Sequence, residues 1–232
     1  MPRILLIETS AALTSVALVG DGKLLFYKEA SHNQASLTAP FIKEALDFAG
    51  ISAKELDAVC VSMGPGSYTG LRVGVSSAKG LCFGAGVPLL AVGTLDVLVW
   101  EAIGQMEPSS GKDSGLYRII PLIDARRMEV YTAEFTPDGR RVTDVHSQIV
   151  EAGTFDDVLS CGQVLFVGDA ADKIASVVKH PNASFLQVSP SARAMARPAV
   201  AEYEAGNFWD IAYFEPFYLK DFVATVSRKK LF

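Results

Sequence analysis

Two carboxylates and one glycine-rich loop are the residues whose types and spacing could carry chemistry in this sequence. Glu8 ends the apolar run that begins at Arg3, and Asp124 ends another apolar run in the second half of the chain. Carboxylates at strand ends can hold Mg²⁺, so an ATP-dependent phosphotransferase is one interpretation. No companion catalytic carboxylate is evident, and the other interpretation is that Glu8 and Asp124 cap or orient neighbouring loops.

The glycine-rich loop lies between a predicted strand and a predicted helix. It reads Gly64-Pro65-Gly66-Ser67-Tyr68-Thr69-Gly70. Glycine lets a backbone turn sharply and approach another surface, and the free N–H groups at a helix start favour an anion or a polar partner. The loop matches neither G-x-x-x-x-G-K-[ST] nor G-x-G-x-x-G. It therefore predicts a contact with a nucleotide or a partner, made by Gly64, Gly66, Ser67, Thr69 and Gly70.

Metal and nucleophile chemistry have weaker support. His32, His146 and His180 lie in separate elements without ligand spacing, so no metal site is predicted. Neither H-E-x-x-H nor G-x-S-x-G occurs, which makes a hydrolase or peptidase with its own cleft the weaker alternative. The three cysteines, Cys60, Cys82 and Cys161, have no C-x-x-C spacing and are predicted to be reduced and packed in the core.

Composition limits the class of protein. The chain has 232 residues, half of them hydrophobic, and a formal net charge of −5. That charge argues against a protein that binds nucleic acid by itself. The short apolar run near the N-terminus is too brief for a signal peptide, and the most apolar stretch, 85–103, is interrupted by Pro88, Gly93 and Asp96. We therefore expect a cytoplasmic protein without a membrane segment.

The elements that must position these residues follow one plan twice, joined by a polar linker at 104–115. The first half predicts strands at 3–8, 14–19, 23–29, 58–63 and 88–92, with helices at 36–49, from Leu71 and at 94–103. The second half predicts strands at 117–124, 129–135, 141–150, 164–167 and 184–188, with helices at 154–159, 171–179 and from Ser189-Pro190.

This duplicated order indicates an α/β fold of two lobes, each a mixed sheet flanked by helices. It is the plan of the actin, Hsp70 and sugar-kinase (ASKHA) superfamily. We expect lobes at 1–104 and 105–232 facing across a cleft, with the C-terminal helix as a candidate to complete the first lobe.

A helical surface is the remaining candidate. The helix at 36–49 is apolar over more than half its circumference, and the loop helix presents small residues on one side. This area is either an interface or intramolecular core, and the sequence leaves both open. Arg72 either reaches across such an interface or is solvated. Arg126 and Arg127 are predicted to form ion pairs between the lobes rather than an anion site, and the tail Arg228-Lys229-Lys230 is either solvated or touches RNA in an assembled complex.

Three motifs resemble one family. Gly64-Pro65-Gly66-Ser67-Tyr68-Thr69-Gly70-Leu71-Arg72-Val73-Gly74, then Ile123-Asp124-Ala125-Arg126-Arg127-x-Glu129-Val130-Tyr131, and Glu215-Pro216-x-Tyr218-Leu219-Lys220 together resemble the bacterial TsaB family, also called YeaZ. Glu8 departs from the Asp that is more usual there. The resemblance implies a catalytically silent paralogue of TsaD, the subunit that transfers a threonylcarbamoyl group to tRNA. The positions of the two TsaD metal ligands are taken by Thr94 and Leu98, and neither side chain can replace an imidazole.

The resemblance also implies partners. It implies a scaffold that binds TsaD and the ATPase TsaE, pairs with a second copy in isolation, and contacts tRNA only indirectly. No cofactor is expected on this chain alone, and ATP or ADP is expected, if anywhere, at the interface of the complex. The implied interface comprises Leu37, Pro40, Phe41, Glu44, Arg72, Val73, Ser76 and Lys79, and the second-lobe motif comprises Asp124, Arg126 and Arg127.

Overall fold

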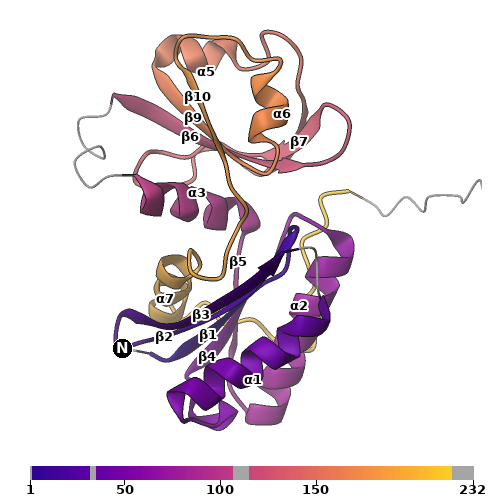
Figure 1. The fold of residues 1–232 in the computed structure, drawn as a ribbon, viewed down its shortest axis with the longest axis vertical. Coiled ribbons are helices and arrows are strands. Elements are labelled where there is room, and N and C mark those ends of the chain that lie inside the picture. The colour runs from indigo at the N-terminus through magenta and orange to yellow at the C-terminus, as the bar shows by residue number, and fades with distance from the viewer. Residues whose placement is uncertain (1, 32–34, 107–114, 221–232) are drawn as a thin grey trace, which may run out of the picture.

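The computed structural model describes residues 2–31, 35–106 and 115–220. These residues form two five-stranded sheets in two lobes, one above the other in Figure 1, and helices cover the sheets. His32, most of the predicted linker and the tail Arg228-Lys229-Lys230 lie outside the described residues. No helix in the described part is long and apolar enough to cross a bilayer.

The first sheet has the strand order β3-β2-β1-β4-β5. Its strands are β1 (Ile4–Glu8), β2 (Leu13–Gly20), β3 (Lys23–Ser31), β4 (Ala58–Ser62) and β5 (Leu89–Val92). The β2–β3 hairpin turns at Asp21 and Gly22, both of which have positive φ. Strands β1, β4 and β5 are parallel, whereas β2 and β3 are antiparallel to their neighbours. All of β1 is buried, so its alternate residues enter two different cores.

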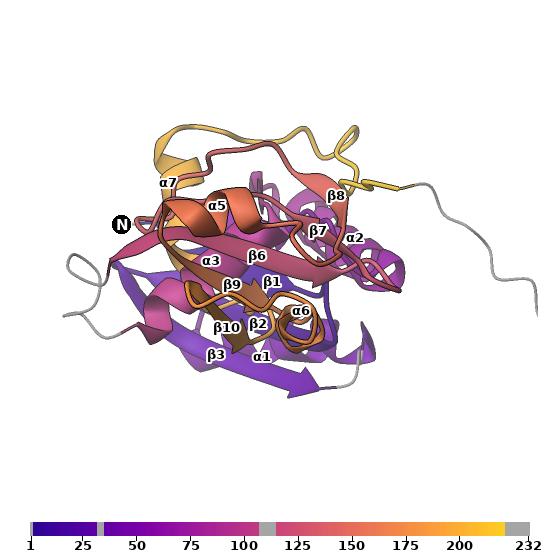
Figure 2. The same cartoon turned by 90° about the horizontal axis from the view of Figure 1, so that it is seen from above.

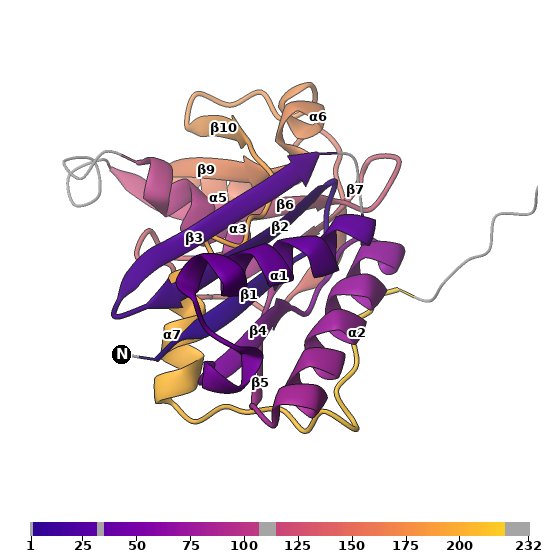
Figure 3. The same cartoon turned by 60° about the horizontal axis from the view of Figure 1, so that its bottom comes forward.

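Helices cover both faces of this sheet. Leu5 and Ile7 face α1 (Thr38–Ala49) and α2 (Tyr68–Ala85), which lie side by side in Figure 3. Two single 3₁₀ turns, η1 (Ala35–Leu37) and η2 (Ala53–Glu55), flank α1. On the opposite face, Ile4 and Leu6 pack against α7 (Ala196–Glu204). The alternation of β1 therefore fixes which helices each side chain meets.

The second sheet repeats the first, with the order β10-β9-β6-β7-β8. Its strands are β6 (Leu116–Asp124), β7 (Glu129–Thr132), β8 (His146–Ile149), β9 (Gln163–Gly168) and β10 (Ala183–Gln187). Helices α5 (Asp156–Cys161) and α6 (Ala171–Ala175) cover its outer face, seen from above in Figure 2, and α3 (Thr94–Gln105) covers the inner face. The repeated strand order confirms the duplicated ASKHA fold class.

The two halves exchange helices. Helix α3 follows the first sheet in the chain, yet Leu95, Leu98 and Ala102 pack against the second sheet. Helix α7 follows the second sheet, yet Met195 and Ala199 at its start pack against the first. The boundary between residues 104 and 105 stays a prediction.

Several element bounds differ from the sequence prediction. Helix α7 begins at Ala196 and not at Ser189, because Ser191 Oγ donates to Glu101 (2.5 Å) and the Ala192 N–H donates to Ser15 Oγ (2.9 Å), which hold the chain in a loop. Strand β8 is much shorter than predicted. Cys161 was predicted to be buried and is exposed at the end of α5, whereas Cys60 and Cys82 are buried as predicted.

Candidate functional site

The glycine-rich loop lies against the turn that follows β1. The Ser67 N–H donates to the Ser10 carbonyl oxygen (2.6 Å), and Thr9 Oγ1 donates to the Gly70 carbonyl oxygen (2.8 Å). A Cβ atom added at Gly66 or Gly70 would overlap the carbonyl oxygens of Ser10 and Thr9. The close approach that these glycines permit is therefore made, in part, to the chain's own backbone.

Glu8 fixes this turn through a hydrogen bond to its backbone. Its Oε1 accepts a hydrogen bond from the Ser10 N–H (2.6 Å), and the residue is fully buried. Burial raises the pKa of this carboxyl, because the charged form is poorly solvated there. Glu8 Oε2 has no hydrogen-bond partner in the described part of the chain. Glu8 does not line the cleft, and its contact with Ser10 agrees with the interpretation that it orients a neighbouring loop.

The positions of the TsaD metal ligands are also enclosed. Thr94 is buried and its hydroxyl is 2.8 Å from that of Ser62, and Leu98 is buried in the core of the second lobe. Among the residues that the structure describes, no group of three or more His, Cys, Asp or Glu side chains could hold a metal ion. His146 and His180 lie apart, in β8 and before β10.

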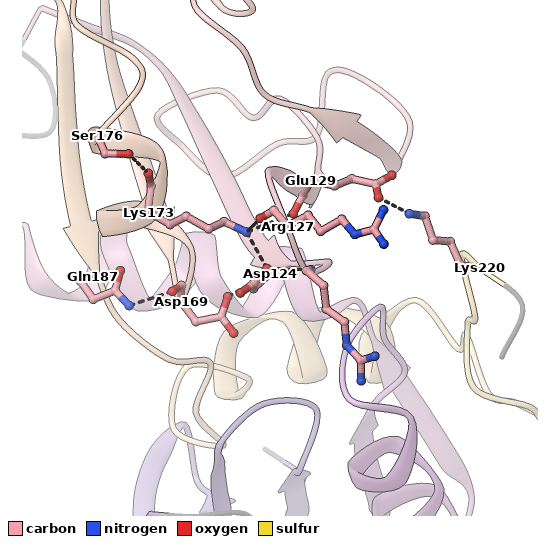
Figure 4. A network of polar contacts seen from close by, with 9 residues as sticks. Asp124, Arg127, Glu129, Asp169, Lys173, Ser176, Gln187 and Lys220 are labelled. Carbon is pink, nitrogen blue, oxygen red and sulfur yellow. Dashed lines mark hydrogen bonds and ion pairs between the residues drawn. The ribbon is translucent and has the colours of Figure 1, made fainter. Parts of the chain in front are cut away.

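The second-lobe motif forms the tight connection between β6 and β7. Arg126 and Arg127 both have positive φ, and the Arg126 N–H donates to Asp124 Oδ1 (2.7 Å). Asp124 also pairs with Lys173 Nζ (2.5 Å), and its own N–H donates to Asp169 Oδ1 (2.9 Å). Figure 4 shows Lys173 reaching across to Asp124 and to the carbonyl oxygen of Arg127. Asp124 therefore orients a turn, as in the simpler interpretation of this carboxylate.

The predicted ion pairs of Arg126 and Arg127 are not formed. Both side chains are exposed, and neither guanidinium has a hydrogen bond or ion pair within the described ranges. The cation that pairs with the second lobe is Lys220, which meets Glu129. Arg126 lines the cleft between the lobes, and the ion pairs of this region are made by Lys173 and Lys220.

The loop and the motif meet at one cleft of about 630 Å³ between the lobes. From the first lobe it is lined by Ser10, Ala11, Ala12, Pro65, Gly66, Ser67, Tyr68 and Thr69, and from the second by Ile123, Asp124, Ala125, Arg126, Tyr131 and Asp169. Residues 217–220 close one side. Burial raises the pKa of Asp169, whereas Asp124 is exposed beside Lys173. Polar groups and three tyrosines, Tyr68, Tyr131 and Tyr218, therefore surround a hollow of ligand size.

The C-terminal segment 206–220, here called the strap, was missed in the sequence as a structural element. It pairs at the edge of β5 through Leu89 and Trp209, and the Phe217 N–H donates to the Met63 carbonyl oxygen (2.7 Å). Tyr218 stacks on Tyr68 with ring centroids 4.5 Å apart. The strap thus runs along the first lobe and ends at the second, as Figure 3 shows for its course past α2. Its aromatic residues were the signal that could have revealed it.

The predicted interface residues divide into buried and exposed groups. Phe41 is only 5% exposed and packs with Ile42 in the core against the first sheet, so the prediction that Phe41 belongs to an exposed interface is wrong. Leu37 and Val73 are partly buried. Lys79 donates to the carbonyl oxygens of Ala212 and Phe214 in the strap (3.5 and 3.0 Å). These residues support the fold of this chain itself.

The exposed residues of α1 and α2 are grouped here under one name, the outer helix face. It is defined by Pro40, Glu44 and Phe48 on α1 and by Arg72, Ser76, Gly80, Phe83 and Gly84 on α2, most of them four residues apart. Phe48 is 68% exposed and Phe83 is 80% exposed. A Cβ atom at Gly80 or Gly84 would meet open space, whereas one at Gly74 would overlap Thr9. Arg72 stacks on Tyr68 and donates to its hydroxyl (2.8 Å).

The duplicated sheet and the cleft between its lobes define a two-lobed protein of the ASKHA class. The family model that matches, over residues 28–200, is TsaD: tRNA N6-adenosine threonylcarbamoyltransferase. With the relatives described below, this shows that the chain belongs to the TsaB (YeaZ) family.

Known proteins of this family resemble the chain in sequence and in structure. A tRNA threonylcarbamoyladenosine biosynthesis protein TsaB from Escherichia coli K12 is 36% identical over 139 residues, which are 59% of this chain and 56% of that protein. The solved structure of YeaZ from Pseudomonas aeruginosa has a TM-score of 0.78 at 25% identity and covers 94% of this chain and all of its own. A second Pseudomonas aeruginosa structure, described as an uncharacterized protein with similarity to peptidase YEAZ, has a TM-score of 0.79 at 25% identity, over 95% of this chain and all of its own. The chain spans about half the length of the curated relatives it matches.

Proposed function

We propose that this chain is a catalytically silent scaffold in the biosynthesis of tRNA threonylcarbamoyladenosine, and that it binds a TsaD-family catalytic subunit through the outer helix face. The observation that carries the proposal is the exposure of Phe83 on α2, the helix that also carries the open positions Gly80 and Gly84, together with the exposure of Phe48 on α1. Exposed aromatic residues are characteristic of interfaces, and small residues let a partner helix approach closely. Relatives named for this pathway support the same assignment.

The proposal includes the other partners of such a scaffold. A TsaE-family ATPase joins the complex, and without a TsaD-family protein two copies of this chain pair through the same face. ATP or ADP binds at the interface of the complex and not on this chain alone. The net charge of −5 favours indirect contact with tRNA, held by the assembly in the cytoplasm.

Reconstitution tests the proposal. The purified chain alone should give no transferase product, and its addition to a TsaD-family and a TsaE-family protein with ATP and tRNA should restore product. The mass of the mixture, measured by light scattering, should show a complex with the TsaD-family protein that replaces the homodimer. Ser76→Trp on the outer helix face should abolish this complex, whereas Ser160→Trp on the exposed side of α5 is the matched control. Restored product without any complex, or no effect on the reaction, would contradict the proposal.

The alternative is an ATP-dependent phosphotransferase or a peptidase that uses the cleft between the lobes. The observation in its favour is the 630 Å³ hollow with Asp124 at its wall. Calorimetry with ATP and Mg²⁺, followed by an activity assay of Asp124→Ala, separates the two functions. Turnover that depends on Mg²⁺ and is lost in this variant would favour the enzyme over the scaffold.

A further inference from the structure

A second hollow lies beside β5, an edge strand of the first sheet, between α3, α7 and the strap. Its volume is about 510 Å³, and none of its lining residues lines the cleft between the lobes. Volumes of about 300–1,000 Å³ are typical of pockets that take small ligands or side chains of a partner. We call this hollow the aromatic pocket, after Trp100, Phe208 and Trp209 in its wall.

The aromatic walls favour a cation. The faces of indole and phenyl rings carry negative electrostatic potential and attract guanidinium and ammonium groups. Phe208 and Trp209 remain about half exposed on the strap, so their rings are accessible. The chain itself provides an example, because the guanidinium of Arg197 lies 4.4 Å from the centroid of the Trp100 ring.

The charges of the pocket favour the same ligand class. Asp96 is paired with Arg141, and Gly93 leaves the space that this pair needs. Glu202 accepts a hydrogen bond from the neutral Asn207 amide (2.8 Å) and has no cationic partner among the described residues. Asp96 and Glu202 both line the hollow. Burial raises the pKa of Asp96, and the nearby charge of Glu202 adds to this effect. Arg197 lies on the Trp100 ring, so a further cation would bind beside Trp209, where it gains the charge of Glu202.

We propose that the aromatic pocket binds an organic cation of the alkylguanidinium type, such as the side chain of arginine, between the ring of Trp209 and the carboxylate of Glu202. The ligand is either a free small molecule or an arginine side chain of a partner segment, since both present the same group. The inference is independent of the outer helix face and of the role in tRNA modification.

Intrinsic fluorescence gives a direct test, because both tryptophans of the chain line this pocket. The full chain is titrated with N-acetyl-arginine methylamide and, as the neutral isostere, with N-acetyl-citrulline methylamide. We expect a saturable change in fluorescence with the arginine probe and binding that is at least fivefold weaker with the citrulline probe. Equal binding of the two probes, or no saturable change, would overturn the proposal.

Two variants on one helix locate the site. Glu202→Gln should weaken binding of the arginine probe about fivefold or more, whereas Glu204→Gln, on the exposed side of α7, should leave it unchanged. Thermal unfolding of both variants verifies that they fold. An equal loss in both would overturn the proposal, because it would indicate general surface charge. Tighter binding of Ala-Ala-Arg-Ala-Ala than of the single-residue probe would identify a partner segment as the source of the cation, and equal binding a small molecule.

Discussion

Gly70 and Thr9 are so close that the Thr9 carbonyl oxygen occupies the place where a Cβ atom of residue 70 would lie. The contact joins the start of α2 to the end of β1, which are far apart in the sequence. It explains the glycine in chemical terms, because a backbone oxygen cannot rotate away as a flexible side chain can.

The first prediction concerns this contact. Gly70→Ala should destabilise the chain by about 1–3 kcal/mol, because the added methyl group overpacks two backbone segments. Gly80→Ala is the matched control on the same helix: it meets open space and should stabilise the isolated chain by about 0.5–1 kcal/mol. Urea unfolding of both variants measures the difference. An equal change in the free energy of unfolding of the two variants would contradict this prediction, because it would mean that the loop can move away from Thr9 to make room for the methyl group.

The second prediction concerns Glu8 and pH. Its pKa is raised above 4.5 in the folded state, mainly by burial, so the folded chain binds this proton more tightly than the unfolded chain. The stability contributed by the protonated form is complete below about pH 4.5 and is lost as pH rises towards the folded pKa. Glu8→Gln has no charge to bury, so it should gain on the wild type by up to about 1.4 kcal/mol for each pH unit in that window. Urea unfolding from pH 4 to pH 8 measures both chains, and parallel profiles would contradict the assignment.

The third prediction separates folding from assembly. Phe41→Asp should unfold the chain or cost more than about 3 kcal/mol, since it removes a core ring and buries a charge. Phe48→Asp should cost about 1 kcal/mol or less, because its ring is mostly exposed and lies in a tilted arrangement beside Phe26. Circular dichroism and size-exclusion chromatography distinguish the two outcomes. A folded Phe41→Asp chain that fails to assemble would restore Phe41 to the interface.

The fourth prediction concerns the strap. Tyr218→Ser removes the stack on Tyr68 and should speed hydrogen exchange of the Phe217 amide roughly two- to tenfold, as expected from the stability of an aromatic pair. Tyr213→Ser, 84% exposed on the same segment, is the control and should leave that exchange rate unchanged. Mass spectrometry of the exchanged peptides measures both. The same rate in the two variants would show that backbone bonds alone hold the strap.

Much of the fold could be predicted from the sequence, because the strands are short apolar runs with strong turn residues between them. Asp21 and Gly22 mark a hairpin, and Gly50 ends α1 with positive φ as its position predicts. The start of α7 could not be predicted in this way. Ser189-Pro190 is a favourable helix start, but Ser191 and Ala192 form tertiary hydrogen bonds that local propensity does not contain.

The sequence predicted several residues of the candidate site but not the side chains that they contact. Residues 65–69 of the loop and Asp124 line one cleft, in agreement with the predicted pair of lobes facing across a cleft, whereas Gly64 and Gly70 are not among its lining residues. The burial of Phe41 could not be read from periodicity, because an amphipathic helix with a wide apolar face does not reveal which part meets its own sheet. The pairing of Lys173 with Asp124 joins residues that no local pattern connects.

The crossing of α3 and α7 means that each half of this polypeptide depends on the other half for a helix that covers one face of its sheet. If the chain is cut between α3 and β6, the first fragment keeps the apolar helix α3 without the sheet that it packs against and lacks α7 over its own sheet. The second fragment keeps α7 without its sheet and lacks α3. Each fragment alone should aggregate, and only the two fragments refolded together should give a soluble, folded complex.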